Sequence, residues 1–223
     1  MKKDHDTKRS LAFFALLLIQ LMISCETQPV LPEIPKDYFP LSDNFHLNYL
    51  KENIFNGETE TVWASDTMTF TVLGDTLVEG IAYKKIINDF GILEKIVRKE
   101  GFRYFGRNHE LYGGFSHEYM FLDTKVPADS SWVYIKDNGN TKTEYVVKEV
   151  NASYTVNGIE YKDVIKLDVN YYNNYGDGVN FELWLSSKHY YANGIGEIYA
   201  YYPPNLSGTY NNVRISLLPS SNN

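Results

Sequence analysis

Cysteine is nearly absent from this 223-residue chain: Cys25 is its one cysteine, so no intramolecular disulfide can form. Positive charge is also scarce, because 21 Lys plus Arg stand against 28 Asp plus Glu, for a formal net charge of −7. Nucleic-acid binding depends on a basic surface, and this balance argues against it. The same balance argues against electrostatic attachment to anionic lipids.

A membrane-spanning hydrophobic segment is also lacking. The apolar run Leu11–Ile23 is interrupted by Gln20 and is shorter than the ~20 apolar residues that cross a bilayer as a helix. Four basic residues precede this run within the first nine positions. A basic start followed by a short apolar run is the layout of a secretory signal peptide. We therefore expect residues 1–24 to be a signal peptide.

The end of that leader explains the single cysteine. Ser24 and Cys25 resemble the lipobox of bacterial lipoproteins, whose cysteine carries a lipid, although Met22 stands where leucine is usual. Lipidation would also remove a free thiol from an oxidising compartment. The sequence thus predicts a protein of the bacterial cell envelope, anchored by a lipid on Cys25, with the outer membrane as the expected site and its periplasmic or outer face left open. The alternative is a plain secretory leader in which Cys25 is incidental.

Residues 25–37 form the expected tether. Prolines occur there at positions 29, 32 and 35, and such spacing favours an extended, semi-rigid spacer. Residues 38–223 are then expected to form one domain. Without residues 1–24 the chain keeps 199 residues and a formal charge of −9. A domain of that size buries roughly 70% of its unfolded surface and needs no disulfide.

The pattern along residues 44–223 is that of β-strands. Nineteen tyrosines and twelve phenylalanines fit pleated, half-buried surfaces. Apolar and polar residues alternate in "VIKLDVNYY" (164–172) and "FELWLSS" (181–187), and the second segment places Trp184 opposite Leu183 and Leu185. "ILEKIVRKE" (92–100) lacks an N-cap and is expected to be part of a hairpin. The fold class is therefore all-β: an antiparallel meander of ten to twelve strands, curled into a barrel-like or half-barrel sheet.

Turn signals separate these strands. They include "LGDT" (73–76), "KEG" (99–101) and "ANGIG" (192–196), and the strongest hairpin signal is Asn138-Gly139. One repeat is visible: "VEGIAYKKII" (78–87) and "VNGIEYKDVI" (156–165) share six of ten positions. Gly80 and Gly158 are expected at positive φ, which glycine tolerates. The repeat indicates two similar hairpins, unless the similarity arose by chance.

An ordered set of short motifs resembles a family of secreted lipoproteins of unknown function from Bacteroidota. The motifs are "YFPLSDNFHLNYL" (38–50), "VEGIAYKKI" (78–86), "VPADSSW" (126–132), "VNGIEYKDVI" (156–165) and "HYYANGIGEI" (189–198). Asn44, Leu47 and Ala128 depart from the family pattern at packing or turn positions. The resemblance implies a curled antiparallel sheet closed by Tyr190, Tyr191, Gly194 and Gly196, with Trp132 filling core. It implies no activity and no catalytic residue.

Candidate residues for chemistry are few. His109, Glu110, His117 and Glu118 could face one another across a hairpin and bind a divalent ion, or they could form a polar strand face. The chain contains no G-x-S-x-G elbow and no phosphate-binding glycine loop. A carboxylate pair for glycoside hydrolysis would leave no sequence signature. We therefore expect no enzyme and no cofactor.

Three functions remain open from the sequence. The first is a non-catalytic envelope lipoprotein whose curled sheet shelters a lipid or another apolar ligand. The second is a surface module that binds a glycan or a protein, with Trp63 or Trp184 as stacking platforms. The third is a hydrolase with carboxylates or histidines converging in a cleft. Apolar residues without enough bulk to fill the interior would favour the first.

Overall fold

The computed structural model describes residues 36–56, 60–110, 114–136, 139–174, 180–204 and 212–219. These belong to one compact unit, Pro35–Asn223. The expected signal peptide, Cys25 and all three tether prolines lie outside the described residues, as does Asn138 of the expected hairpin. None of the described residues lies in a helix long and apolar enough to cross a bilayer.

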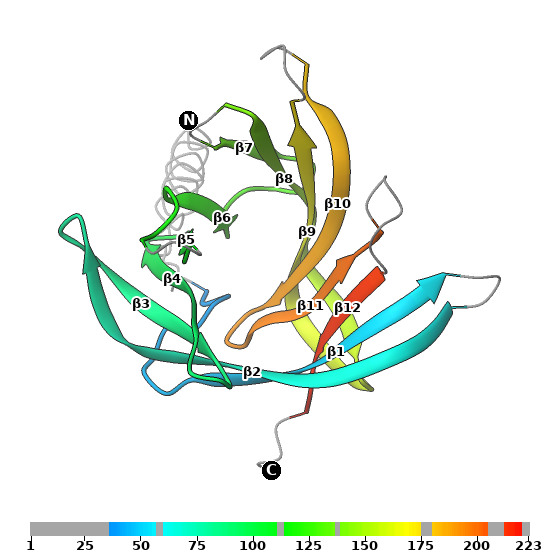
Figure 1. Ribbon diagram of the computed structural model, residues 1–223. Helices are drawn as coiled ribbons and strands as arrows, with labels where there is room; N and C mark the ends of the chain where they lie inside the picture. Colours follow the sequence, from blue (N-terminus) through cyan, green and yellow to red (C-terminus); the bar gives the residue numbers. More distant parts are fainter. Residues whose placement is uncertain are drawn as a thin grey trace, which may run out of the picture. The chain divides into compact units, whose positions relative to one another are not determined.

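The described residues contain twelve strands and confirm the all-β prediction (Figure 1). They are β1 (His46–Asn56), β2 (Glu60–Val78), β3 (Ile81–Asn88), β4 (Leu93–Glu100), β5 (Arg103–Asn108), β6 (Tyr119–Asp123), β7 (Ser131–Ile135), β8 (Thr141–Val156), β9 (Ile159–Asn173), β10 (Glu182–Ala192), β11 (Gly196–Tyr202) and β12 (Asn212–Leu217). Leu93–Glu100 is thus a strand that pairs with both β3 and β5, as expected for part of a hairpin.

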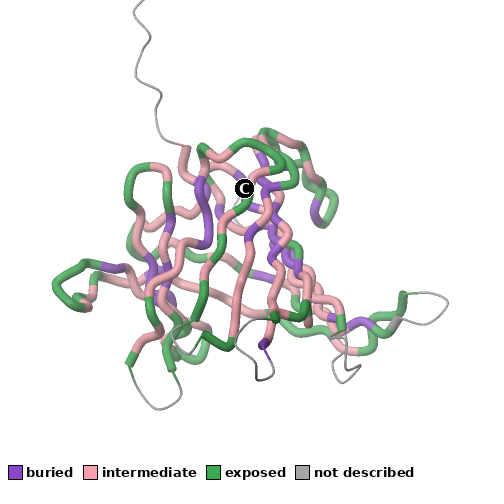
Figure 2. Tube along the Cα trace, turned by 90° about the horizontal axis from the view of Figure 1, so that it is seen from above, coloured by how far each residue is buried: buried purple, intermediate pink, exposed green. Residues whose placement is uncertain are grey.

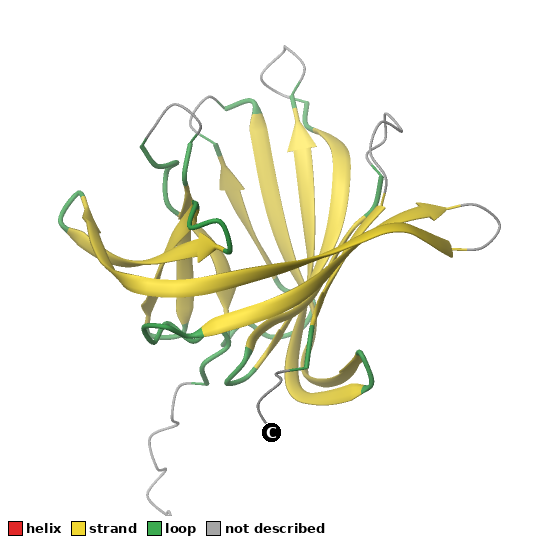
Figure 3. Cartoon of the chain, turned by 60° about the horizontal axis from the view of Figure 1, so that its bottom comes forward, coloured by secondary structure: helices red, strands yellow, loops and turns green. Residues whose placement is uncertain are grey.

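All twelve strands form one antiparallel sheet, nearly closed into a barrel (Figure 3). The strand order in the sheet is β6-β5-β4-β3-β2-β1-β12-β11-β10-β9-β8-β7. The first strand of the chain, β1, therefore pairs with the last one, β12. The sheet remains open between β6 and β7, which are consecutive in the chain but share no ladder. The indole Nε1 of Trp132 on β7 donates to the carbonyl of Met120 on β6 at 2.8 Å, so side chains hold this seam.

Strand alternation places the core inside the curled sheet. Ile165, Leu167 and Val169 are buried on β9, as the period-two pattern predicted. Buried and less buried positions also alternate along β5 and β11, and Figure 2 shows the buried positions spread over the sheet. The prediction for Trp184 was wrong. A register shift between Leu183 and Leu185 breaks the alternation, so Trp184 contacts Tyr171 with the ring centroids 6.2 Å apart, while Leu183 is exposed.

Several glycine turns have the expected geometry. Gly80 and Gly158 both have a φ of 80°, and each follows a residue that is also at positive φ, Glu79 or Asn157. Two successive positive φ values are the signature of a type I′ hairpin turn, so the repeated motif builds the same turn twice. The expected turn at "LGDT" is wrong: Gly74 lies inside the 19-residue strand β2, at a register shift against β3.

The segment before β1 is held against the inside of the sheet. Tyr38 is buried, and its backbone N–H donates to the Tyr104 hydroxyl on β5, which in turn donates to Asp37. The N–H of Gly194, in the turn between β10 and β11, donates to the Asp37 carbonyl at 2.6 Å. Residues 36–45 are therefore joined to strands that lie far from them in the sequence.

Candidate functional site

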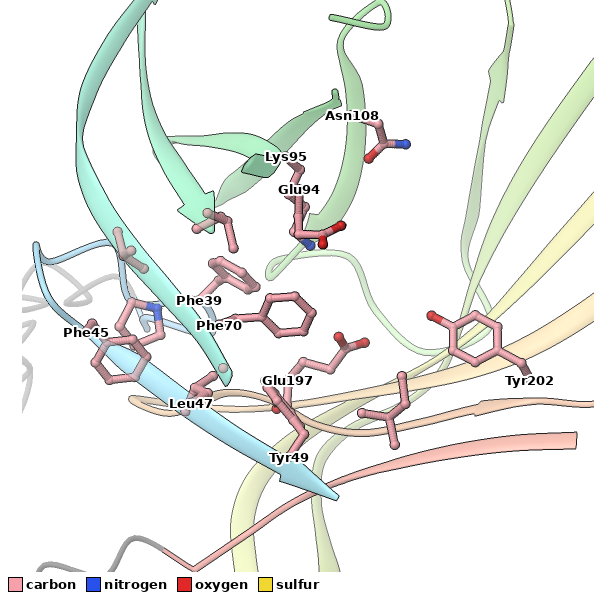
Figure 4. A pocket seen from close by; sticks show the side chains of 15 residues that line it. Phe39, Phe45, Leu47, Tyr49, Phe70, Glu94, Lys95, Asn108, Glu197 and Tyr202 are labelled. Carbon is pink, nitrogen blue, oxygen red and sulfur yellow. The ribbon is translucent and has the colours of Figure 1, made fainter. Parts of the chain in front are cut away.

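A cavity of about 240 Å³ lies between residues 36–45 and the inner face of the sheet (Figure 4). It is larger than the ~150 Å³ apolar cavity that binds benzene in an engineered protein. The segment 36–45 and strands β1 to β3 and β12 supply most of its apolar lining. These residues are Phe39, Pro40, Phe45, Leu47, Tyr49, Phe70, Val72, Ile86 and Ile215.

Its floor depends on a glycine. Gly196 at the start of β11 has a φ of 115°, and a Cβ placed there would lie 3.1 Å from Cδ1 of Leu47. A side chain at this position would displace the Leu47 side chain, which lines the cavity. The Tyr49 hydroxyl donates to the carbonyl of Glu197, the next residue, which ties β1 to β11 below the cavity.

Polar side chains enter the cavity from β4, β5 and β11. They are Glu94, Lys95, Asn108, Glu197 and Tyr202, and Lys95 and Glu197 point into the same space from opposite walls (Figure 4). The lining thus combines a continuous apolar surface with a few polar groups, as small-molecule sites do.

Lys95 is the amine of this lining. It is half-buried, and its Nζ lies 5.2 Å from the Phe39 ring centroid and 5.4 Å from that of Phe121. Burial lowers the pKa of Lys95, while the charges of Glu197 and Glu94 partly oppose that shift. Among the described residues, no acceptor lies within hydrogen-bonding or ion-pairing distance of this Nζ.

Glu197 is supported from behind the cavity wall. Nδ1 of His189 lies 2.6 Å from Glu197 Oε1, and the Ser187 hydroxyl lies 2.9 Å from Nε2 of His189. Burial alone would raise the pKa of Glu197, but the hydrogen bond with His189 and nearby positive charge outweigh it, so the pKa is lowered. Glu197 therefore presents a charged carboxylate to the cavity.

Ser187, His189 and Glu197 are linked by hydrogen bonds in the same way as a hydrolase triad. The serine, however, is not accessible to a substrate. Ser187 has no exposed surface and does not line the cavity. A nucleophile must reach its substrate, so these three side chains are better explained as a hydrogen-bonded support for the Glu197 carboxylate.

The four candidate metal ligands are not brought together as a site. Arg98 binds the Glu118 carboxylate with both Nε and Nη2, at 2.7 and 2.6 Å, and the Tyr83 hydroxyl also donates to it. His109 pairs with Phe115 in an isolated β-bridge, and Glu110 and His117 are exposed. Within the described part of the chain, no three His, Cys, Asp or Glu side chains are grouped to hold a metal ion.

The two candidate tryptophans differ in exposure. Trp63 on β2 is 58% exposed, beside Val62 and near Phe55 on β1, which are also exposed. Trp184 is half-buried against Tyr171. Only Trp63 therefore presents most of its ring to solvent.

Sequence reasoning missed the charged residues of the cavity. Lys95 and Glu197 are separated by about a hundred positions, and each resembles an ordinary strand residue in the sequence. One signal was available in the sequence. Ser187, His189 and Tyr191 are two residues apart, so their side chains lie on the same face of a strand, and the family resemblance placed Tyr191 in the closed sheet. Polar residues at positions whose side chains point inward indicate a polar site inside a curled sheet.

Two solved structures show a distant likeness to this fold. A candidate lipoprotein from Parabacteroides distasonis matches over 83% of this chain and 98% of its own, at 9% identity and a TM-score of 0.44. A candidate exported protein with a YmcC-like fold, from Bacteroides fragilis, matches over 82% and 97%, at 9% identity and a TM-score of 0.39. No family model matches the chain, and no curated protein matches it. Similarity at this level carries nothing about ligand or activity.

Proposed function

We propose that this chain is a non-catalytic envelope lipoprotein whose curled sheet holds one small, largely apolar ligand. The observation that carries the proposal is the cavity of about 240 Å³ beneath the rings of Phe39, Phe45 and Phe70. A cavity with an apolar lining that side chains leave unfilled stabilises an apolar guest, because binding removes apolar surface from water.

The way in which the cavity is built supports a binding role. Two of its aromatic rings, Phe39 and Phe45, come from residues 36–45, which hydrogen bonds from Tyr104 and Gly194 fix to the sheet. A wall fixed in this way is pre-organised, so a ligand does not have to order it on binding. The polar groups that point into the cavity, Lys95 and Glu197, would orient the polar end of the ligand.

The envelope location of the proposal rests on the sequence. Residues 1–24 have the layout of a secretory leader, and Ser24-Cys25 resembles a lipobox. A lipid on Cys25 would place the cavity close to a membrane, where apolar molecules are abundant. The ordered motifs that resemble Bacteroidota lipoproteins agree with this assignment.

A neutral fluorescent dye, N-phenyl-1-naphthylamine, tests the proposal with two matched variants of the full chain. Leu47→Trp adds bulk at the cavity wall, whereas Leu77→Trp makes the same change at a side chain that is 72% exposed. We expect the wild type and Leu77→Trp to bind one dye each, and Leu47→Trp to bind it at least several-fold more weakly. Equal binding by both variants, or no binding by the wild type, would overturn the proposal. Circular dichroism confirms that both variants are folded.

One observation favours the alternative of a surface-binding module. Phe55, Val62 and Trp63 are all exposed on the projecting hairpin of β1 and β2 (Figure 1). Exposed aromatic groups of this kind serve as stacking platforms for glycans or as anchors in protein interfaces. A glycan array probed with wild type and Trp63→Ala tests it: signals that Trp63→Ala abolishes would favour this function.

A further inference from the structure

The environment of Lys95 is unlike that of the neighbouring Lys99 on the same strand. Both ammonium groups lie over aromatic rings, Lys99 at 5.1 Å from the centroid of Tyr104. Lys99 also forms an ion pair with Asp37 at 3.2 Å. Within the described residues Lys95 has no such partner, and its Nζ faces the cavity (Figure 4). The cavity therefore contains a primary amine that forms no ion pair with any carboxylate of the described residues.

The charged groups around Lys95 restrict the charge of a ligand that can bind beside it. Two carboxylates, Glu94 and Glu197, line the same cavity, and the Asn88 side-chain amide donates to Glu94 at 2.6 Å. Both carboxylates already interact with the amine of Lys95, and His189 lies behind Glu197 as the next titratable group. A ligand with its own carboxylate would add a further negative charge to this partly desolvated space. A neutral ligand adds none, and the site therefore favours a neutral ligand.

We propose that the cavity takes a small, neutral, apolar aldehyde or ketone, and that Lys95 holds its carbonyl carbon as an imine. This inference rests on the proposed function, because it names the class of ligand for the same cavity. The apolar part of the ligand would lie against Phe39 and Phe70, with its carbonyl group directed toward Lys95.

The covalent step conserves charge. The ammonium of Lys95 gives up one proton, the resulting amine attacks the carbonyl carbon, and the carbonyl oxygen leaves as water. The released proton returns to the nitrogen, so a protonated imine remains. Written from the ammonium form, R–NH₃⁺ and O=CHR′ give R–NH⁺=CHR′ and H₂O, so the positive charge stays at the same nitrogen. Glu94, Glu197 and the two ring faces that stabilise the ammonium therefore stabilise the protonated imine as well. The step needs no oxidant, reductant or metal.

Burial supports the reactivity of this amine. It lowers the pKa of Lys95, which increases the unprotonated fraction at neutral pH over that of a solvated lysine. The charged carboxylates of Glu94 and Glu197 oppose this shift without cancelling it.

Reductive trapping tests the inference on the full chain. The protein is incubated with hexanal and sodium cyanoborohydride, and the alkylated lysines are mapped by peptide mass spectrometry. We expect roughly tenfold more modification at Lys95 than at Lys99, because a ligand bound in the cavity meets the amine at high effective concentration. Lys95→Arg keeps the charge and removes the primary amine, so it should lose the preferred site and leave modification of Lys99 unchanged.

Hexan-1-ol separates this inference from the proposed function, because it fits the same space and forms no imine. Displacement of the dye by hexan-1-ol together with preferred trapping at Lys95 supports both. Displacement without preferred trapping overturns the imine and leaves the cavity function standing. Preferred trapping that a large excess of hexan-1-ol does not reduce also overturns the inference, since the reaction would then lie outside the cavity.

Discussion

Glu118 offers a sharp test of how the sheet is stabilised. Its carboxylate accepts two hydrogen bonds from Arg98 on β4 and one from Tyr83 on β3. Because Glu118 directly precedes β6, these bonds connect the start of β6 to β3 and β4. The side chains of Arg98 and Glu118 are only 17% and 20% exposed. Glu118→Gln keeps the shape of this group, removes its charge and leaves the Arg98 guanidinium without its bidentate partner.

The expected cost follows from the burial of the pair. Removing one partner of a fully buried ion pair costs about 3–5 kcal/mol. Here both groups retain some solvent contact, and Arg98 keeps a second bond to Glu100 at 2.6 Å. We therefore expect Glu118→Gln to lower the free energy of unfolding at pH 7 by about 2 kcal/mol. For a domain of this size that corresponds to a fall in Tm of roughly 4–8 °C.

The cost should also depend on pH. Burial would raise the pKa of Glu118, but the hydrogen bonds from Arg98 and Tyr83 outweigh it, so the pKa in the folded state is lowered. A carboxyl group with a lowered pKa stabilises the fold fully above its unfolded pKa of about 4.3 and loses that contribution as the pH falls through its folded pKa. The difference between wild type and Glu118→Gln should therefore be largest at neutral pH and shrink below about pH 4.

Urea unfolding from pH 3 to pH 8 measures both effects. Glu100→Gln is the matched control, because Glu100 contacts the same Arg98 but its side chain is 70% exposed, and we expect a change of about 0.5 kcal/mol or less. Equal stability of Glu118→Gln and wild type at pH 7 would refute the reasoning. A chelator that destabilises the wild type as much as Glu118→Gln does would indicate instead that this carboxylate binds a metal.

Three further substitutions test individual features of the sheet. Gly158→Ala forces a Cβ into a φ of 80° and should lower the free energy of unfolding in urea by about 1–2 kcal/mol, whereas Gly74→Ala, at a site without positive φ or close neighbours, should not. Trp132→Phe removes the indole donor across the open seam, so we expect a loss of about 1 kcal/mol and faster amide exchange in β6 and β7. Gly196→Ala should both destabilise the fold and weaken dye binding, since its Cβ would displace Leu47.

Much of the fold could be predicted because local pattern and tertiary structure agree. The alternation at Ile165, Leu167 and Val169 gave the correct inner face, since period-two burial follows directly from strand geometry. The glycines at 80 and 158 gave correct turns, because only a residue tolerant of positive φ suits a type I′ hairpin. Asn44 follows the same rule: it has a φ of 63°, a left-handed conformation that asparagine tolerates better than most residues.

The errors arose where a register shift interrupts the pattern. Trp184 and Gly74 both lie at such shifts. At Trp184 one extra residue reverses the face on which the following side chains lie. At Gly74 the extra residue is a glycine inside a continuous strand, which the sequence pattern cannot distinguish from a turn. The pairing of β1 with β12 was also invisible, because it depends on where the whole sheet curls. The cavity depends on that closure, so Lys95 and Glu197 could be recognised as neighbours only in three dimensions.

A crystal structure of the protein grown with hexan-1-ol would test the central claim most directly. We expect density for one alkyl chain between the rings of Phe39, Phe45 and Phe70, with its hydroxyl group toward Lys95 and Glu197. A cavity filled with ordered water, with the alcohol bound only at the exposed ring of Trp63, would contradict the account and favour a surface-binding function.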